Sequence, residues 1–170
     1  MKTGLFIGRF QPFHLGHLSV IRQMEKECDE LIIAIGSAQY GFYDKNPMTA
    51  GERMEAIGKV LRKEIKKPFC IVPVEDINCY PKYVSHVESL VPEFDVVYNT
   101  GNEVIAELFA AAGYEVRNFQ KKVGICATEV RKAIAEGSEW KHFVHEEVFS
   151  FLVEKKIDER IRRLMKDESR

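Results

Sequence analysis

Short apolar runs recur along the chain with amphipathic segments between them, and this alternation limits the fold more than any other feature of the sequence. The runs lie at residues 4–8, 31–36, 69–74, 95–98 and 114–119. Short runs that are apolar throughout are typical of strands buried on both faces of a sheet. Because helical segments separate them, they predict a right-handed, mostly parallel sheet with helices on both faces.

The segments between the runs have helical periodicity. Residues 18–28 carry one apolar stripe, and Thr49 with Glu52 forms the capping-box signal that starts a second helix. Further helices are expected at residues 84–90, 104–112, 128–136 and 146–166, the last with a break near Lys156. Only helices follow the fifth run, so the pattern predicts a helical C-terminal extension.

Together these elements predict one α/β domain, a three-layer sandwich with a five-stranded parallel sheet. The α/β core is expected over residues 1–120, and the extension is expected over residues 121–170. No repeat, low-complexity stretch or long Gly/Ser/Pro linker argues for a second domain. The 170 residues are enough to bury one sizeable core.

The charge balance of the chain excludes some partners. The formal net charge is −1 at pH 7, so the chain has no general basic field for nucleic acid or an anionic membrane, and any phosphate site must be local. The sequence shows no apolar leader segment, and no apolar run approaches the roughly 18 residues of a membrane span. We therefore expect a cytoplasmic protein without nucleic-acid or membrane partners.

The four cysteines are widely spaced and include no CxxC pair. They are Cys28, Cys70, Cys79 and Cys126. No histidine lies near them at a zinc-site interval. We expect reduced and mostly core thiols, rather than metal ligands or disulfide partners, and no metal site is predicted.

The stretch GRFQPFHLGH, residues 8–17, stands where the first strand passes into a helix. It matches neither GxGxxG nor the P-loop pattern. Gly16 would let the backbone approach a ligand, and His14 and His17 are three residues apart, so their ring N–H groups can converge on one anion. Arg9 can add a bidentate fork. The alternatives are capping or packing histidines with a surface arginine, or a metal pair without an evident third ligand.

A second cluster, residues 124–131, lies between the fifth strand and a helix. Small residues come first, followed by Thr128 and then Arg131 one turn later, so amides, a hydroxyl and a guanidinium can face one anion. The alternative is a threonine N-cap and a solvent-exposed arginine. Because the carboxyl ends of parallel strands meet at one sheet edge, both clusters are expected at the same phosphate site.

Both clusters resemble known signatures. Residues 14–17, HLGH, match the HxGH signature of the nucleotidyltransferase superfamily, and residues 126–131 resemble its second signature, (S/T)xTxxR. The wider strings GRFQPFHLGH, IGSAQ, PMTAGER and TEVR resemble the archaeal type of nicotinamide-nucleotide adenylyltransferase. The likeness extends to about residue 153 and implies a Rossmann-like fold.

The resemblance implies transfer of AMP from ATP to nicotinamide mononucleotide, giving NAD and pyrophosphate, with Mg²⁺ on the phosphates and no covalent enzyme intermediate. By the family's motifs, His14 and His17 bind the triphosphate and stabilise the transition state, while Arg9 and Arg131 hold phosphates. These four residues form the predicted catalytic set. Further ATP contacts are expected from Gly8, Phe10, Gly16, Lys45, Cys126 and Thr128.

The sequence departs from the family pattern at three positions. Cys126 replaces the usual serine, a better hydrogen-bond donor. Lys45 stands where close relatives carry an arginine, which keeps the charge but loses the fork. Tyr83 stands where relatives place a tryptophan that stacks on nicotinamide, so stacking is kept with a smaller ring.

The expected nicotinamide-nucleotide contacts are Tyr83, Asp76 and Asn102. For Asp76 a contact with this nucleotide and capping of the next helix are comparable interpretations. For Asn102, within the turn at residues 99–102, nucleotide contact and a plain loop both stay open.

Two alternative functions are kept. One is the same ATP site with another acceptor, such as phosphopantetheine. The other is a module that senses ATP or NAD without turnover, against which the intact histidine and arginine set argues. A homo-oligomer is expected, and the resemblance implies a hexamer.

Overall fold

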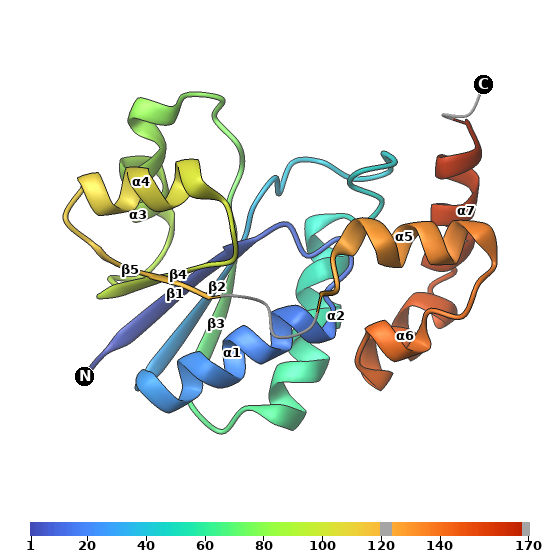
Figure 1. Cartoon of the computed structure of the whole chain (residues 1–170), viewed down its shortest axis with the longest axis horizontal. Helices are drawn as coiled ribbons and strands as arrows, with labels where there is room; N and C mark the ends of the chain where they lie inside the picture. The colour runs from blue at the N-terminus through green and yellow to red at the C-terminus, as the bar shows by residue number, and fades with distance from the viewer. Residues whose placement is uncertain (120–123, 168–170) are drawn as a thin grey trace.

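The computed structural model describes residues 1–119 and 124–167, and the centre of this part is a parallel sheet of five strands (Figure 1). The strands are β1 (Thr3–Gly8), β2 (Glu30–Ile35), β3 (Phe69–Pro73), β4 (Val96–Asn99) and β5 (Glu115–Asn118). Their order is β3-β2-β1-β4-β5, and each neighbouring pair is parallel. The strand order therefore reverses at β1, which confirms the predicted α/β, Rossmann-like sheet.

Helices follow each strand, and more helices form the C-terminal extension. They are α1 (Leu15–Glu27), α2 (Ala50–Glu64), α3 (Tyr83–Leu90), α4 (Glu103–Ala111), α5 (Ala127–Glu136), α6 (Glu146–Glu154) and α7 (Ile157–Asp167), with short 3₁₀ helices η1 (Tyr80–Lys82) and η2 (Lys141–Phe143). The capping box at the start of α2 is confirmed, because the Glu52 N–H donates to Thr49 Oγ1 at 3.2 Å and the Thr49 N–H donates to Glu52 at 2.9 Å.

The two faces of the sheet carry separate cores, and the alternation of side chains along each strand produces them. On β2, Leu31, Ile33 and Ile35 join the core that α1 and α2 cover, whereas Ile32 and Ala34 join the core beneath α3 and α4. Figure 1 shows these helix pairs on opposite faces of the sheet. The double burial explains why β2 is apolar at every position from Leu31 to Ile35.

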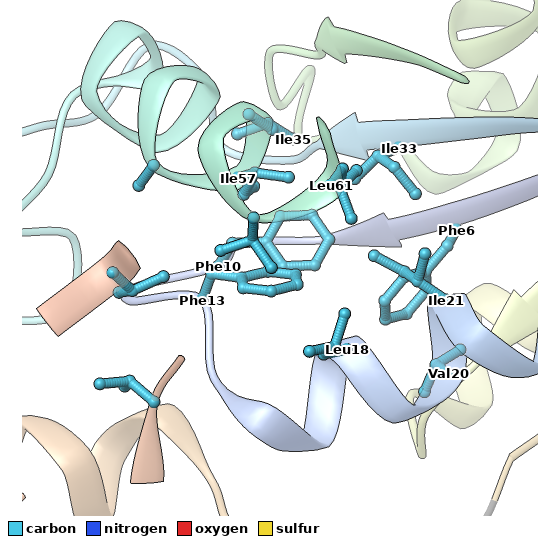
Figure 2. Packing of buried hydrophobic residues seen from close by; sticks show 14 of the residues in the cluster. Phe6, Phe10, Phe13, Leu18, Val20, Ile21, Ile33, Ile35, Ile57 and Leu61 are labelled. Carbon is cyan, nitrogen blue, oxygen red and sulfur yellow. The ribbon is translucent and has the colours of Figure 1, made fainter. Parts of the chain in front are cut away.

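The larger core also fixes the turn that leaves β1. Figure 2 shows the rings of Phe10 and Phe13 between Leu18 of α1 and Ile57 and Leu61 of α2. Both phenylalanines are almost fully buried. The turn after β1 is therefore a packed part of the core rather than a free loop.

The edge strands differ from the prediction that all strands are buried on both faces. Every residue of β3 is half-buried or exposed, and so is every residue of β5, whereas all four residues of β4 are buried. Each edge strand has a neighbour on one side only, so more of its surface stays open. This part of the prediction was wrong.

The C-terminal extension packs on the rest of the domain through α6, which contacts α2, and within the extension α7 contacts both α5 and α6 (Figure 1). Arg160 of α7 donates to both carboxylate oxygens of Glu52 at 2.8 and 2.9 Å and to the Pro47 carbonyl at 3.0 Å. The break near Lys156 is confirmed, because α6 and α7 meet there and Lys156 has a φ of 55°. The predicted division between residues 120 and 121 lies outside the described residues.

The cysteines are free thiols, but only Cys28 lies in the core. Cys70, Cys79 and Cys126 are half-buried, so the prediction of mostly core thiols was wrong. Cys70 lies on the open edge strand β3 and packs against the core beneath α3 and α4, whereas Cys79 and Cys126 are the N-cap residues of η1 and α5. No helix in the described part of the chain combines the length and the apolar character that crossing a membrane requires.

Candidate active site

A cleft of about 650 Å³ opens at the carboxyl ends of β1 and β4, where the strand order reverses. Ligands bind at this place in open parallel sheets because the two crossover connections diverge there. The cleft brings together most of the predicted site residues. Its lining includes Gly8, Arg9, Phe10, His14, His17, Asp76, Tyr83, Asn102, Cys126, Thr128 and Arg131.

Two clusters define the cleft, and we name them by their chemistry. The cationic side consists of Arg9, His14 and His17 from the turn between β1 and α1, together with Arg131 from α5. The aromatic side consists of Asp76, Tyr80 and Tyr83 from the segment that follows β3.

The two histidines of the cationic side are held as a stacked pair. Their ring centroids are 3.6 Å apart with an angle of 22° between the planes, and both side chains are buried. The His14 N–H donates to His17 Nδ1 at 3.2 Å. Because Nδ1 accepts this bond, a neutral His17 carries its ring hydrogen on Nε2, which makes that atom a donor for an anion.

Aromatic contacts fix the orientation of the His17 ring. The Phe10 ring meets it edge to face at 4.8 Å, and the Phe13 ring stacks on it at 5.5 Å. Preorganised donors of this kind stabilise developing charge without reorganising during the reaction.

Gly16 does not line the cleft, although it was predicted to allow close approach of a ligand. A Cβ atom at Gly16 would lie 2.9 Å from Cε1 and Nδ1 of the His14 ring. In the structure, a glycine is needed at this position because a side chain there would collide with the His14 ring. Gly8 leaves room for a neighbouring ring in the same way, since a Cβ atom at Gly8 would lie 2.8 Å from the Phe10 ring.

Arg131 is buried and joins the two predicted clusters. Its Nη1 donates to the Gln11 carbonyl at 2.7 Å, and its Nη2 donates to Thr128 Oγ1 at 3.4 Å. Burial lowers the pKa of Arg131, and the positive charge of Arg9 lowers it further. Two guanidinium groups near one another in a cleft favour an anionic ligand between them. The alternative of a solvent-exposed arginine was wrong.

The start of α5 places Cys126 and Thr128 at the cleft. Cys126 is the N-cap residue, and its N–H donates to the Glu129 carboxylate at 3.0 Å. Thr128 is exposed and lies inside the first turn. The alternative that Thr128 is the N-cap was therefore wrong, and its hydroxyl is directed to Arg131 instead.

Asp76 is bound to the end of β2 rather than to a helix. Its carboxylate accepts from Ser37 Oγ at 2.7 Å and from the Ser37 N–H at 3.2 Å. The N-caps of η1 and α3 are Cys79 and Lys82, so the alternative that Asp76 caps the next helix was wrong. The carboxylate instead fixes the aromatic side against the sheet.

Tyr83 begins α3 and is half-buried, with its ring edge to face against Phe109 at 6.3 Å. Burial raises the pKa of its hydroxyl to about 12, and the charge of Asp76 adds to this shift. The ring is therefore neutral at physiological pH. Asn102 caps α4, since its Oδ1 accepts from the Ile105 N–H at 3.3 Å, and it also lines the cleft.

Lys45 does not line the cleft. It lies exposed at the tip of a tight turn, in which the N–H groups of Tyr43 and Asn46 donate to each other's carbonyls at 3.2 and 3.1 Å. The structure thus separates Lys45 from the cationic side with which it was grouped.

Three polar residues that organise the cleft were not predicted. The Gln11 amide makes two hydrogen bonds with the Met48 backbone at 2.8 and 2.9 Å, Ser37 binds Asp76, and Arg53 is buried beside the cleft. Gln11 carries a signal, because it is a polar residue in an apolar turn. The partners of Ser37 and Arg53 come from distant segments and leave no local pattern.

Within the described residues, no group of three or more His, Cys, Asp or Glu side chains is arranged to hold a metal ion. The cationic side offers hydrogen-bond donors and positive charge. Such a set suits an anionic ligand such as a polyphosphate.

The chain resembles known proteins over nearly its whole length. A family model described as Cytidylyltransferase-like matches residues 5–161. The chain is 45% identical over 166 residues to a nicotinamide-nucleotide adenylyltransferase of Methanococcus aeolicus, and the match covers 96% of this chain and 95% of the relative. The corresponding protein of Pyrococcus furiosus is 43% identical over 169 residues, with 96% of this chain and 89% of the relative covered.

Solved structures share the fold at lower identity. A bifunctional NMN adenylyltransferase/ADP ribose pyrophosphatase from Francisella tularensis superposes with a TM-score of 0.78 at 20% identity, covering 95% of this chain. The match spans 52% of that chain, about half its length. A structure of the bifunctional Francisella tularensis protein complexed with AMP and a Mn ion gives a TM-score of 0.79 at 20% identity. The match covers 99% of the chain described here and 53% of the Francisella tularensis chain.

Proposed function

The chain belongs to the nicotinamide-nucleotide adenylyltransferases within the Cytidylyltransferase-like family, and we propose that its cleft transfers AMP from ATP to nicotinamide mononucleotide, releasing pyrophosphate and forming NAD. One observation carries the assignment of the site. Residues 120 positions apart, Gln11 in the first cluster and Arg131 in the second, are joined by a hydrogen bond at the cleft. Both clusters thereby become one anion site.

The reaction needs positioning and charge stabilisation rather than a nucleophile from the protein. The phosphate oxygen of the mononucleotide attacks the α-phosphorus of ATP, a new phosphoanhydride bond forms, and the bond to pyrophosphate breaks. Negative charge grows on the leaving pyrophosphate. The buried histidine pair and the two arginines of the cationic side supply donors where that charge develops.

Each residue of the cationic side has a role in this scheme. His17 donates a hydrogen bond from Nε2 to a phosphate oxygen of the leaving group, and the adjacent ring of His14 supplies a second hydrogen-bond donor. Arg9 is exposed at the cleft and holds the outer phosphates, whereas buried Arg131 holds the triphosphate from the α5 side. Gly8, Phe10, Cys126 and Thr128 shape the wall beside the ATP.

Mg²⁺ enters with ATP as part of the substrate. The donor set supports this, because the cationic side carries N–H groups rather than carboxylates, so the triphosphate itself would hold the ion. When bound, the ion neutralises charge on the phosphate oxygens. Lys45 can assist only if its turn moves toward the bound triphosphate, and its ATP contact remains a prediction.

The aromatic side is the proposed acceptor pocket. Tyr83 offers a neutral ring for stacking on the nicotinamide, Asp76 lies beside it as an anionic group, and Asn102 closes the pocket from α4. A homo-oligomer, hexameric by family resemblance, and a cytoplasmic location also remain predictions.

The test is pyrophosphate release from ATP and Mg²⁺ with one acceptor at a time. The acceptors are nicotinamide mononucleotide, nicotinate mononucleotide and 4′-phosphopantetheine, with an acceptor-free reaction as the blank. We expect turnover with a pyridine mononucleotide. Turnover with phosphopantetheine alone would overturn the acceptor assignment, and tight nucleotide binding without turnover on any acceptor would identify a sensor.

Replacing Tyr83 by alanine is expected to weaken binding of nicotinamide mononucleotide by about 1–3 kcal/mol, the range for one base stacked on an aromatic ring. ATP affinity is expected to change by less than about twofold, since Tyr83 lies outside the cationic side. Tyr83→Phe keeps the ring and should keep the affinity. Calorimetric titration of each nucleotide measures these effects.

Tyr80 provides the matched comparison, because it also lines the cleft but is 62% exposed. We expect Tyr80→Ala to have a much smaller effect on mononucleotide binding than Tyr83→Ala. The reverse order would assign the stacking ring to Tyr80.

A further inference from the structure

Arg53 of α2 lies beneath the cleft with 1% of its surface exposed. Its Nε donates to the Thr49 carbonyl at 3.2 Å, and its Nη1 donates to the carbonyls of Arg9 and Gly36 at 2.9 and 2.8 Å. Its Nη2 donates to the carbonyls of Ser37 and Tyr40 at 3.1 and 3.4 Å. Each of these five hydrogen bonds ends on a backbone carbonyl.

This arrangement is unusual for a buried charge. Within the described residues, no carboxylate oxygen lies within ion-pair distance of the Arg53 guanidinium, although buried charges are ordinarily paired. Burial and the nearby charge of Arg9 lower the pKa of Arg53 to about 10. The negative charge of Asp76 acts on Arg53 in the opposite direction without forming an ion pair. The group is still protonated at physiological pH, so a positive charge that binds only backbone carbonyls stands beneath the anion site.

The carbonyls that Arg53 binds come from the ends of two neighbouring strands. Arg9 follows β1, whereas Gly36 and Ser37 follow β2. Carbonyl oxygens carry partial negative charge, which repels a triphosphate. By binding these oxygens, the guanidinium offsets that charge at the edge where the cleft lies.

The same turns hold two strained residues. Phe10 and Ser37 are not glycines, yet each has a φ of 52°. Such conformations persist only where the surroundings fix them. Arg53 binds the carbonyl of Ser37 itself and that of Arg9, the residue before Phe10. It therefore holds both turns, including the backbone that carries the exposed Arg9 side chain.

We propose that Arg53 is a positioning residue for the ATP phosphates. Its buried guanidinium fixes the strained turns after β1 and β2 and thereby presents Arg9 to the cleft. Its positive charge also offsets the partial charge of the carbonyls at this edge of the sheet, so that an anion can bind there. It does not touch the substrate. The inference rests on the proposed function in that ATP is the anion bound at the cationic side.

The primary test is Arg53→Ala, with ATP and nicotinamide mononucleotide titrated separately by calorimetry. We expect ATP binding to weaken by about 10–100-fold, because one guanidinium both orders the turns and compensates the carbonyls. Mononucleotide binding is expected to stay within about threefold of the wild type. Arg62→Ala, at an exposed arginine of the same helix, is the control and should change neither affinity.

Chemical rescue separates charge from simple filling of space. Methylguanidinium at millimolar concentration should restore ATP binding to Arg53→Ala, whereas methylurea, a neutral molecule of similar shape, should not. Equal rescue by both would overturn the proposal and leave a space-filling role. Unchanged ATP affinity, or equal weakening for both nucleotides, would also overturn it.

Arg53→Lys covers the case in which the alanine variant fails to fold. Lysine keeps the positive charge, but its single ammonium group cannot donate hydrogen bonds to carbonyls from several segments at once. We expect selective loss of ATP affinity here too, and equal losses for both nucleotides would count against the proposal. ATP titration requires no acceptor, so a wrong acceptor assignment would leave this test intact, and the two failures are distinguishable.

Discussion

Replacing His17 by alanine is expected to lower kcat by about 10²–10³-fold, the usual cost of removing one preorganised donor from a site of developing negative charge. ATP affinity should change by less than about threefold, because the lost interaction is strongest in the transition state. Steady-state kinetics with nicotinamide mononucleotide give kcat, and calorimetric titration gives the ATP affinity.

The control for this variant is His142→Ala. His142 is exposed, packs on Phe143 and does not line the cleft, so its removal should leave kcat unchanged. His17 also accepts the His14 N–H at the start of α1, and the melting temperature of each variant shows whether this lost bond affects folding. A fully active His17→Ala would remove the proposed mechanism, and a parallel loss of ATP affinity and kcat would assign His17 to ground-state binding.

Arg131→Ala is expected to reduce kcat/KM for ATP by about 10²–10³-fold, since the variant loses a buried guanidinium that lines the cleft and is proposed to hold the triphosphate. It also leaves the Gln11 carbonyl without the donor that Arg131 now supplies at 2.7 Å. Arg131→Lys keeps the charge and loses the fork, so an intermediate value is expected. Initial rates at varied ATP concentration measure both.

Lys132 is the matched control for Arg131. It is the exposed next residue of α5, and its ion pair with Glu136 lies at the surface. Lys132→Ala should leave kcat/KM within about twofold. If Arg131→Ala behaves in the same way, the second cluster does not bind the triphosphate, and the common anion site has to be abandoned.

The sheet could be predicted because its signal is local. Burial on two faces makes β2 apolar at consecutive positions, and Thr49 and Glu52 mark the start of α2 within one turn. The open edges of β3 and β5 could not be predicted, because which strands stand at an edge depends on the order of strands in space rather than on the residues of any one strand.

The site was predictable to the extent that residue type and spacing encode it. His14 and His17 come together within one turn, and Arg131 follows Thr128 by a single turn. The role of Arg53 could not be predicted, because its partners are backbone carbonyls, which every residue carries. These carbonyls come together only in the folded turns. Lys45 was placed by resemblance alone, and the turn that bears it keeps the side chain out of the cleft.

The hydrogen bond between Arg131 and Gln11 also has a consequence for how the protein is made. A ribosome releases β1 and α1 first and α5 much later, because synthesis runs from the N-terminus. Because these partners are 120 positions apart, all five strands of the sheet are synthesised before Arg131 can join the cleft. The cleft is therefore complete only after α5 has been synthesised and has docked.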